Sequence, residues 1–517
     1  MPNSGNPFKN KTVTNNDPQL AINETNMINL KLDYGINKDW DLSAISAYSE
    51  VLTKWSDYDS DDSSIDGGTR FFKEENSTFT QELRLTFDYD NLTGLIGAYY
   101  FKQDIPSLFG GTSTISLASA GVNAPFLQAQ FGLDDATAAF VVAQYADFDP
   151  VILEQQTTST QDISTYALFS DVTYQISDQW DIFAGLRWDR EEQKNADTQN
   201  LAVGNLEAMP NFANYPAPLN QLIAGINAQL IANVDVANQL IPLADASFNE
   251  LVPKVGVSYH WNENITTSFI LQEGYRSGGV GVNTAKATPF QFDPEFTTNY
   301  EISLRSVWLD GSLVANANFF YIDWQDQQVS VQLSENSFDS QVLNAGTSNI
   351  KGFEIELNYK FNSELTFYSS LGQAKSEFEE FTIVIPTAGE SVIFDLSGRS
   401  FADAPEWTAN AGLTYLADNG VFANLSINYA DKSPADTNPF SRGLSEADNG
   451  FDLQNEGRTL VNMQVGYEWQ SIGIYLVAKN LFDEEYIAGA AFGTGRGMFR
   501  HDLGAPRELS LSLRGTF

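Results

Sequence analysis

The sequence closes on Gly504-Ala505-Pro506-Arg507-Glu508-Leu509-Ser510-Leu511-Ser512-Leu513-Arg514-Gly515-Thr516-Phe517, and this stretch decides between two kinds of fold. Leu509, Leu511 and Leu513 alternate with serine or arginine, so a β-strand here has one apolar and one polar face. In a soluble sheet the apolar face would cover a protein core. In a membrane barrel it would meet lipid, while the polar face would line a wet lumen. The remainder of the chain has to distinguish the two.

The composition narrows the classes of protein. The 517 residues carry 28 Lys and Arg against 67 Asp and Glu, a net charge of -39, which argues against nucleic acid as a partner because phosphate binding needs a basic surface. There is no cysteine, and the only histidines are His260 and His501. We therefore expect no cofactor, no metal site and no histidine-based catalysis. No run of 18 apolar residues is present, so no transmembrane helix is expected.

Short segments with apolar and polar residues in alternation follow one another along the chain. The pattern is clearest in 353–361 and 461–469, and about 17 such segments can be counted from residue 26 onward. The connections alternate between tight turns and long excursions, as in a porin-type barrel with short periplasmic turns and long external loops. The sequence therefore predicts an all-β fold, an antiparallel transmembrane β-barrel.

Aromatic residues support the barrel, because they gather beside the tight turns as an interfacial girdle would. They are Tyr34, Trp40, Tyr89, Trp180, Tyr259, Trp261, Trp308, Tyr415, Tyr467 and Trp469.

Helical insertions are expected in the two longest external loops, at about 103–157 and 192–249. Asp134 and Asp135 are candidate N-caps for a helix over 136–145, and 219–243 has apolar residues at helical spacing. Such helices could form a lid over the barrel mouth. Alternatively, they bury their apolar faces against neighbouring loops.

A set of ordered motifs resembles the TonB-dependent outer-membrane receptors, which import scarce nutrients through a plugged barrel of about 22 strands. The motifs that carry the resemblance are Asp293-Pro294-Glu295 with Asn299-Tyr300-Glu301-Ile302, the aromatic strand from Phe319 to Trp324 followed by Gln327, Asn344-Ala345-Gly346 with Gly352-Phe353-Glu354, Ala404-Pro405-Glu406, Asn480-Leu481-Phe482-Asp483 with Tyr486, and the closing strand.

The resemblance implies several partners and a location. These are the bacterial outer membrane and its lipid, the TonB complex acting through a plug, the barrel assembly machinery reading the terminal aromatic Phe517, and a small ligand. The ligand implied by the resemblance is a ferric siderophore, and the function implied is TonB-energised import rather than catalysis.

The resemblance also implies missing parts. A signal peptide, a TonB box, a plug and about five strands of the expected 22 are not visible. We therefore expect residues 1–25 to be an external loop remnant and 26–517 to be the C-terminal part of the barrel. Such a chain would form an incomplete, C-shaped barrel, or one closed by an unnatural seam between 26–35 and 508–517.

Aromatic and cationic side chains at strand tops and loop roots are the candidate ligand contacts: Tyr275, Arg276, Trp324, Arg442, Arg496 and Arg500. The alternative for each arginine is an ion pair with a nearby carboxylate. Two other functions stay open. One is a passive outer-membrane porin or channel. The other is a secreted, acidic, β-rich enzyme, although no set of nucleophile, base and orienting group is visible.

Overall fold

The structure is a computed structural model. It describes residue 8 and residues 19–59, 68–118, 122–238, 240–333, 339–344, 346–385, 392–435, 454–493 and 498–515.

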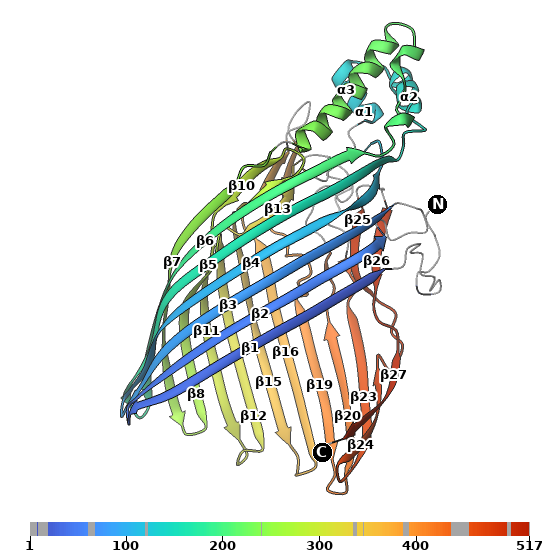
Figure 1. The fold of residues 1–517 in the computed structure, drawn as a ribbon. Helices are drawn as coiled ribbons and strands as arrows, with labels where there is room; N and C mark the ends of the chain where they lie inside the picture. Colours follow the sequence, from blue (N-terminus) through green and yellow to red (C-terminus); the bar gives the residue numbers. More distant parts are fainter. Residues whose placement is uncertain are drawn as a thin grey trace.

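One antiparallel sheet of 17 strands forms the wall, and each strand pairs with the next one along the chain (Figure 1). The fold class and the number of strands are as predicted. The strands are β1 (Leu20–Asn37), β2 (Trp40–Asp59), β3 (Thr69–Tyr89), β4 (Leu92–Ile115), β5 (Val151–Ser177), β6 (Trp180–Val203), β7 (Ala244–Asn262), β8 (Ile265–Arg276), β11 (Glu295–Trp308), β12 (Leu313–Gln325), β15 (Thr347–Lys360), β16 (Leu365–Phe378), β19 (Trp407–Leu416), β20 (Val421–Ala430), β23 (Arg458–Trp469), β24 (Ile472–Lys479) and β27 (Glu508–Gly515).

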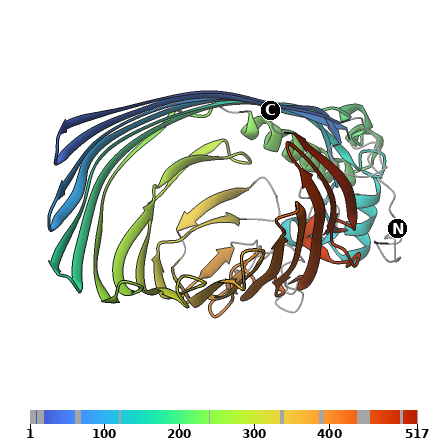
Figure 2. The ribbon, with the colours of Figure 1, turned by 90° about the horizontal axis from the view of Figure 1, so that it is seen from below.

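The sheet curls round, as the view along its strands shows (Figure 2), and its two end strands are β1 and β27. Among the described residues β1 pairs with β2 alone and β27 pairs with β24 alone. Side chains on both faces of β27 are exposed, and nearly all of β1 is exposed as well. Within the described chain these two strands are therefore sheet edges, with one row of backbone groups on each left without a strand partner.

The connections are strongly asymmetric. Eight tight turns lie at one end of the wall, at 38–39, 90–91, 178–179, 263–264, 309–312, 361–364, 417–420 and 470–471. All the long connections lie at the other end, where β1 also begins, whereas β27 runs toward the tight turns (Figure 1). The predicted loop asymmetry is confirmed.

Five of the long connections contain a two-stranded hairpin. The hairpins are β9 (Gly279–Asn283) with β10 (Thr288–Phe292), β13 (Gln328–Gln332) with β14 (Ser340–Asn344), β17 (Thr382–Ile385) with β18 (Val392–Asp395), β21 (Ser433–Pro434) with β22 (Gln454–Asn455), and β25 (Ile487–Gly493) with β26 (Met498–Leu503).

The two faces of the wall differ as the alternation predicts. Apolar residues that pair across strands, such as Ile302 with Phe319 and Leu413 with Leu425, are exposed on the outer face, where lipid would cover them. The opposite face carries polar ladders, for example the hydrogen bond of 2.6 Å from Asn410 to Asn428. The expected girdle is present beside the tight turns, where Trp40 donates to the hydroxyl of Tyr89 at 2.8 Å.

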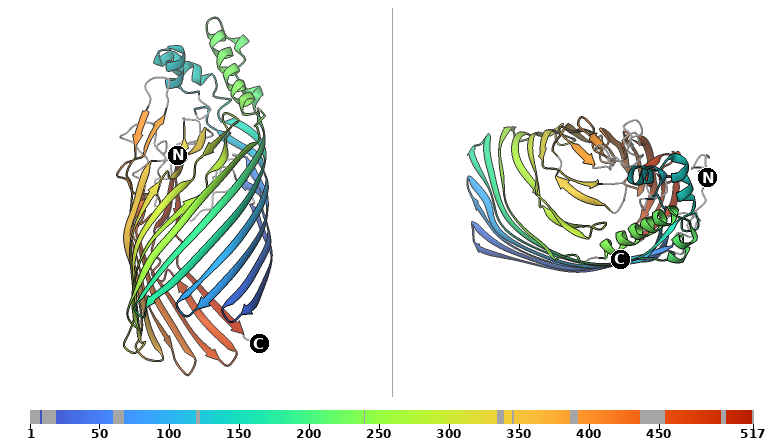
Figure 3. Two further views of the ribbon diagram at one scale, coloured as in Figure 1. Left: turned by 90° about the vertical axis from the view of Figure 1, so that its left-hand side faces the viewer. Right: turned by 90° about the horizontal axis from the view of Figure 1, so that it is seen from above.

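Two connections carry helices, which project beyond the wall (Figure 3). They are α1 (Ala124–Phe131), α2 (Asp135–Ala143) and α3 (Leu219–Ala237), with short 3-10 turns η1 (Leu206–Ala208) and η2 (Phe212–Asn214) before α3. As predicted, Asp134 caps α2, since its carboxylate accepts from the backbone N–H of Thr137 at 2.7 Å.

The helices bury their apolar faces against one another, which is the second of the two expected alternatives. The shared core of this helical cap contains Leu127, Val141, Tyr145, Ile223 and Ile226, all nearly or fully buried. The Tyr145 hydroxyl donates to Asn227 Oδ1 at 2.8 Å, so the polar end of the ring is satisfied inside the core. In the described part of the chain, no helix has the length and apolar character needed to cross a membrane.

The first strands are longer than the alternation indicates. Residues 103–115 extend β4, 151–159 extend β5 and 192–203 extend β6, so these strands rise well past their apolar segments. The connection between β4 and β5 therefore covers 116–150, and that between β6 and β7 covers 204–243.

Candidate functional site

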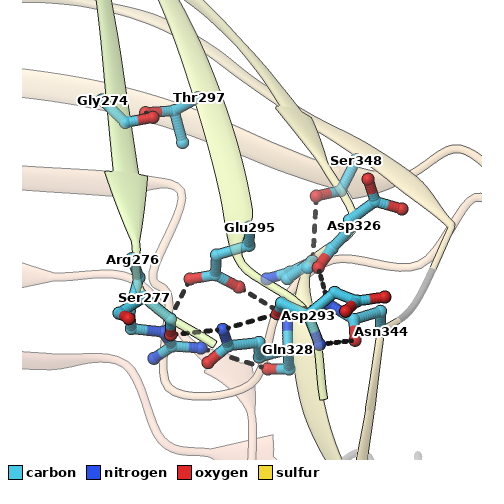
Figure 4. Close-up of polar contacts among 11 residues, drawn as sticks. Gly274, Arg276, Ser277, Asp293, Glu295, Thr297, Asp326, Gln328, Asn344 and Ser348 are labelled. Carbon is cyan, nitrogen blue, oxygen red and sulfur yellow. Dashed lines mark hydrogen bonds and ion pairs between the residues drawn. The ribbon is translucent and has the colours of Figure 1, made fainter. Parts of the chain in front are cut away.

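A hydrogen-bonded network of polar side chains ties together the tops of β8, β11, β12 and β15, where two long connections leave the wall (Figure 4). We call it the loop-root network, and its members are Arg276, Ser277, Asp293, Glu295, Asp326, Gln327, Gln328, Asn344 and Ser348. Several of them are the motif residues that carry the family resemblance. The sequence alone does not show what these motif residues do. Their contacts in the structure show that they hold the ends of the long connections in place.

Glu295 lies at the centre of the loop-root network and is 4% exposed. One carboxylate oxygen pairs with Arg276 Nε at 2.8 Å, and the other accepts from the backbone N–H of Gln328. The side-chain amide of Gln328 donates to the carbonyl oxygen of Ser277 at 2.8 Å and to that of Asp293 at 3.1 Å. One buried carboxylate thus joins the end of β8, the start of β11 and the start of β13.

Asn344 completes the loop-root network from the end of β14. Its Oδ1 accepts from the backbone N–H of Asp293 at 2.9 Å. Its Nδ2 donates to the carbonyl oxygens of Asp293 at 2.9 Å and Asp326 at 2.8 Å. All three bonds go to backbone groups, so this one side chain sets the path of both connections as they leave the wall.

Trp324 lies on the polar, inner face of β12, opposite Thr297 and Ser348 in the register. Its ring makes an edge contact with Phe401 at 5.9 Å between centroids, and Phe401 is 4.7 Å from Phe378. The indole Nε1 is buried and has no hydrogen-bond partner among the described residues. An unpaired buried donor is uncommon, and such a group is a candidate for contact with a ligand.

Tyr275 lies one residue before Arg276 and is half-buried. Its ring stacks on Phe296 with centroids 6.5 Å apart, and it lies among the charges of Asp189, Glu191 and Arg187 on β6. Arg187 holds the carboxylate of Asp189 through two hydrogen bonds of 2.7 Å. Arg276 forms an ion pair with Glu295, as its alternative interpretation expected, while Tyr275, the preceding residue of β8, is paired with Phe296.

The other predicted residues are not placed at this site. Arg442, Arg496 and Phe517 lie outside the described residues, and Arg500 belongs to β26 without a described side chain. Across the described ranges, no group of three or more His, Cys, Asp or Glu side chains could hold a metal ion. At this rim the structure shows an aromatic ring of Tyr275, the ion-paired guanidinium of Arg276 and the unpaired indole N–H of Trp324.

The geometry defines a class of protein. Outward apolar residues, a polar inner face, aromatic residues at the tight turns and long connections at one end together define a bacterial outer-membrane β-barrel.

The comparisons with known proteins name the family. The sequence model of the TonB-dependent receptor-like β-barrel matches residues 2–481, and the chain belongs to this family. The family consists of outer-membrane transport receptors rather than enzymes.

Several solved structures share the fold of this chain. The ferric yersiniabactin uptake receptor FyuA from Yersinia pestis has a TM-score of 0.69 at 16% identity, and the match covers 98% of this chain and 63% of the receptor. The siderophore receptor PiuA from Acinetobacter baumannii has a TM-score of 0.63 at 16% identity, with 97% and 65% covered. The copper transporter OprC has a TM-score of 0.61 at 14% identity, with 95% and 65% covered. The chain thus spans less than two thirds of the length of these proteins.

Proposed function

We propose that this chain forms the wall of an outer-membrane receptor that captures a scarce nutrient outside the cell and imports it with energy supplied by the TonB complex. The proposed cargo is a ferric siderophore. Two observations support this choice. The family match covers most of the chain, and siderophore receptors are among the proteins of similar fold.

The observation that carries the proposal is the position of the loop-root network. It fixes the bases of two of the long connections at the rim of a wall whose inner face is polar, and the other long connections lie at the same rim. A rigid rim can present variable loops to a ligand without losing their spacing, because positioned side chains lose less entropy on binding. A passive channel gains nothing from such a recognition surface.

The proposed ligand contacts follow from the chemistry of a ferric siderophore, which offers an aromatic or oxygen-rich surface. The aromatic and donor groups are Tyr275 and Trp324, and the exposed part of the Arg276 guanidinium supplies positive charge. Arg442, Arg496 and Arg500 are further proposed contacts from the sequence. The proposed partners are the TonB complex, outer-membrane lipid and the barrel assembly machinery, which would read Phe517.

Uptake of radioactive iron by the native bacterium tests the proposal. Deleting the gene should remove uptake of one iron chelate, and an uncoupler that discharges the proton gradient should stop that uptake in the wild type. The passive-channel alternative predicts entry that the uncoupler does not change. A strain that takes up every chelate tested at the wild-type rate after the deletion would contradict the proposal.

A variant at Trp324 tests the proposed contact separately. Trp324→Phe keeps a ring to pack against Phe401 but removes the unpaired Nε1–H donor. We expect a weaker apparent affinity for the chelate with an unchanged unfolding midpoint. Tyr429→Phe is the matched control, because Tyr429 lies exposed on the outer face of β20.

A further inference from the structure

A cavity of about 250 Å³ lies between the helical cap and the wall, apart from the loop-root network. We call it the cap cavity. Residues of helix α3 and of the upper ends of β5 and β6 line it, and Figure 1 shows where these elements lie. Lys286 and Asp339 also line it.

The walls of the cap cavity are mostly apolar. Leu153 and Val203 face each other across the β5–β6 ladder, and Val234 and Ala237 face them from α3. The engineered apolar cavities that bind benzene have a volume of about 150 Å³. The cap cavity is larger, so one aromatic ring with small substituents fits inside it.

One polar group in the cavity has no partner. Gln199 is 7% exposed, and its Nε2 donates to the carbonyl oxygen of Ala237 at 3.4 Å. Its Oε1 is buried and has no hydrogen-bond partner among the described residues. A buried acceptor left unpaired costs about 1–3 kcal/mol, so a ligand that brings a donor recovers this free energy on binding.

The charged side chains that line the cavity are already matched. Asp339 Oδ1 accepts from Lys286 Nζ at 2.8 Å and from Asn283 Nδ2 at 2.7 Å. A charged ligand would lose hydration among apolar walls without gaining a free counter-charge. The cavity therefore favours a neutral molecule.

From these observations we infer that the cap cavity is a binding site for a neutral monocyclic aromatic molecule bearing a hydroxyl group, which donates its hydrogen bond to Gln199 Oε1. The ring occupies the space between α3 and the tops of β5 and β6. The site is separate from the proposed import of a ferric siderophore and does not depend on it.

Two fluorinated probes that differ only in the hydroxyl group test this inference by ¹⁹F NMR on the detergent-solubilised chain. These are 4-fluorophenol and fluorobenzene. Gln199→Leu keeps an apolar side chain of similar length but removes the acceptor. It should weaken binding of 4-fluorophenol by about tenfold, the equivalent of about 1.4 kcal/mol, and leave fluorobenzene unchanged.

Val234→Trp fills the cavity and should abolish specific binding of both probes, which also measures their background partition into detergent. Ile231→Trp is the matched control, because Ile231 is an exposed residue of the same helix that does not line the cavity. The inference is overturned if Val234→Trp binds both probes as the wild type does, or if Gln199→Leu weakens both probes equally. Unchanged unfolding midpoints establish that the variants are folded.

Discussion

Arg276 and Glu295 face each other at the outermost rung of the β8–β11 ladder, with Nε 2.8 Å from Oε1. The partners are unequally exposed, because the Glu295 side chain is buried while much of the Arg276 side chain is in solvent. The ion pair with the solvent-exposed Arg276 therefore contributes less to stability than the hydrogen bond that the buried Glu295 carboxylate accepts from the backbone N–H of Gln328.

Replacing Glu295 should loosen the connections that it joins. Glu295→Ala leaves the N–H of Gln328 without its acceptor, and we expect a cost of about 1–3 kcal/mol in the unfolding free energy of this region. Limited proteolysis within 277–294 should become faster. Glu295→Gln keeps an acceptor for the Gln328 N–H and should fall between Ala and the wild type. Identical cleavage rates for all three proteins would contradict the assigned role.

Asn344 offers a sharper test, because its three hydrogen bonds differ in direction. Asn344→Asp keeps an acceptor for the Asp293 N–H but sets a negative oxygen against the carbonyl groups of Asp293 and Asp326. At neutral pH we expect Asp to speed amide exchange in β13 and β14 at least as much as Ala does, by about tenfold or more. Exchange that is slower in the Asp variant than in the Ala variant would show that the acceptor bond dominates.

The sequence predicts the wall well, because lipid on one side and water on the other impose a strict alternation. In 353–361 apolar residues alternate strictly with polar ones, so the sequence alone indicates which face of the strand each side chain occupies. The upper parts of the first strands were missed. Residues 151–159 of β5 carry mostly polar residues on both faces, so nothing in their pattern distinguishes a strand from a loop.

The candidate site is less visible in the sequence. The loop-root network joins residues some 51 positions apart, such as Asp293 and Asn344, and no local period reports such a contact. The family resemblance marks these residues without explaining them. Gln199 gave no signal at all, because an unpaired buried acceptor depends on the packing of α3 against β6 rather than on neighbours in the chain.

The helical cap should lose stability in acid through its N-cap. The hydrogen bond from the backbone N–H of Thr137 holds the pKa of the Asp134 carboxyl below its ordinary value of 3.8. A lowered folded-state pKa means that the stabilisation is present above 3.8 and is lost as the pH falls through the folded-state value. Amide exchange of α2 should therefore accelerate in that acidic range.

The variant Asp134→Asn separates capping from titration, since Asn caps a helix but carries no acidic proton. We expect Asn to keep α2 protected at neutral pH and to remove the acid-dependent part of its exchange. Asp134→Ala should speed the amide exchange of α2 at neutral pH as well as in acid, because it removes the cap. If the acid-dependent exchange of α2 persists unchanged in the Asn variant, a titratable group other than Asp134 causes it.

The orientation of the wall in lipid can be tested with two neighbouring residues of β16. Leu371 pairs with Ile355 on the apolar outer face, and Ser370 pairs with Glu356 on the polar inner face. An arginine on the lipid face near the middle of the membrane costs about 2–4 kcal/mol, whereas one in the lumen stays hydrated. Leu371→Arg should therefore lower the unfolding free energy in lipid vesicles by about this amount. Ser370→Arg should leave it nearly unchanged, because the new cation lies beside the carboxylate of Glu356. Equal destabilisation by both variants would mean that the two faces share one environment, and the wall would then cover a protein core rather than lipid.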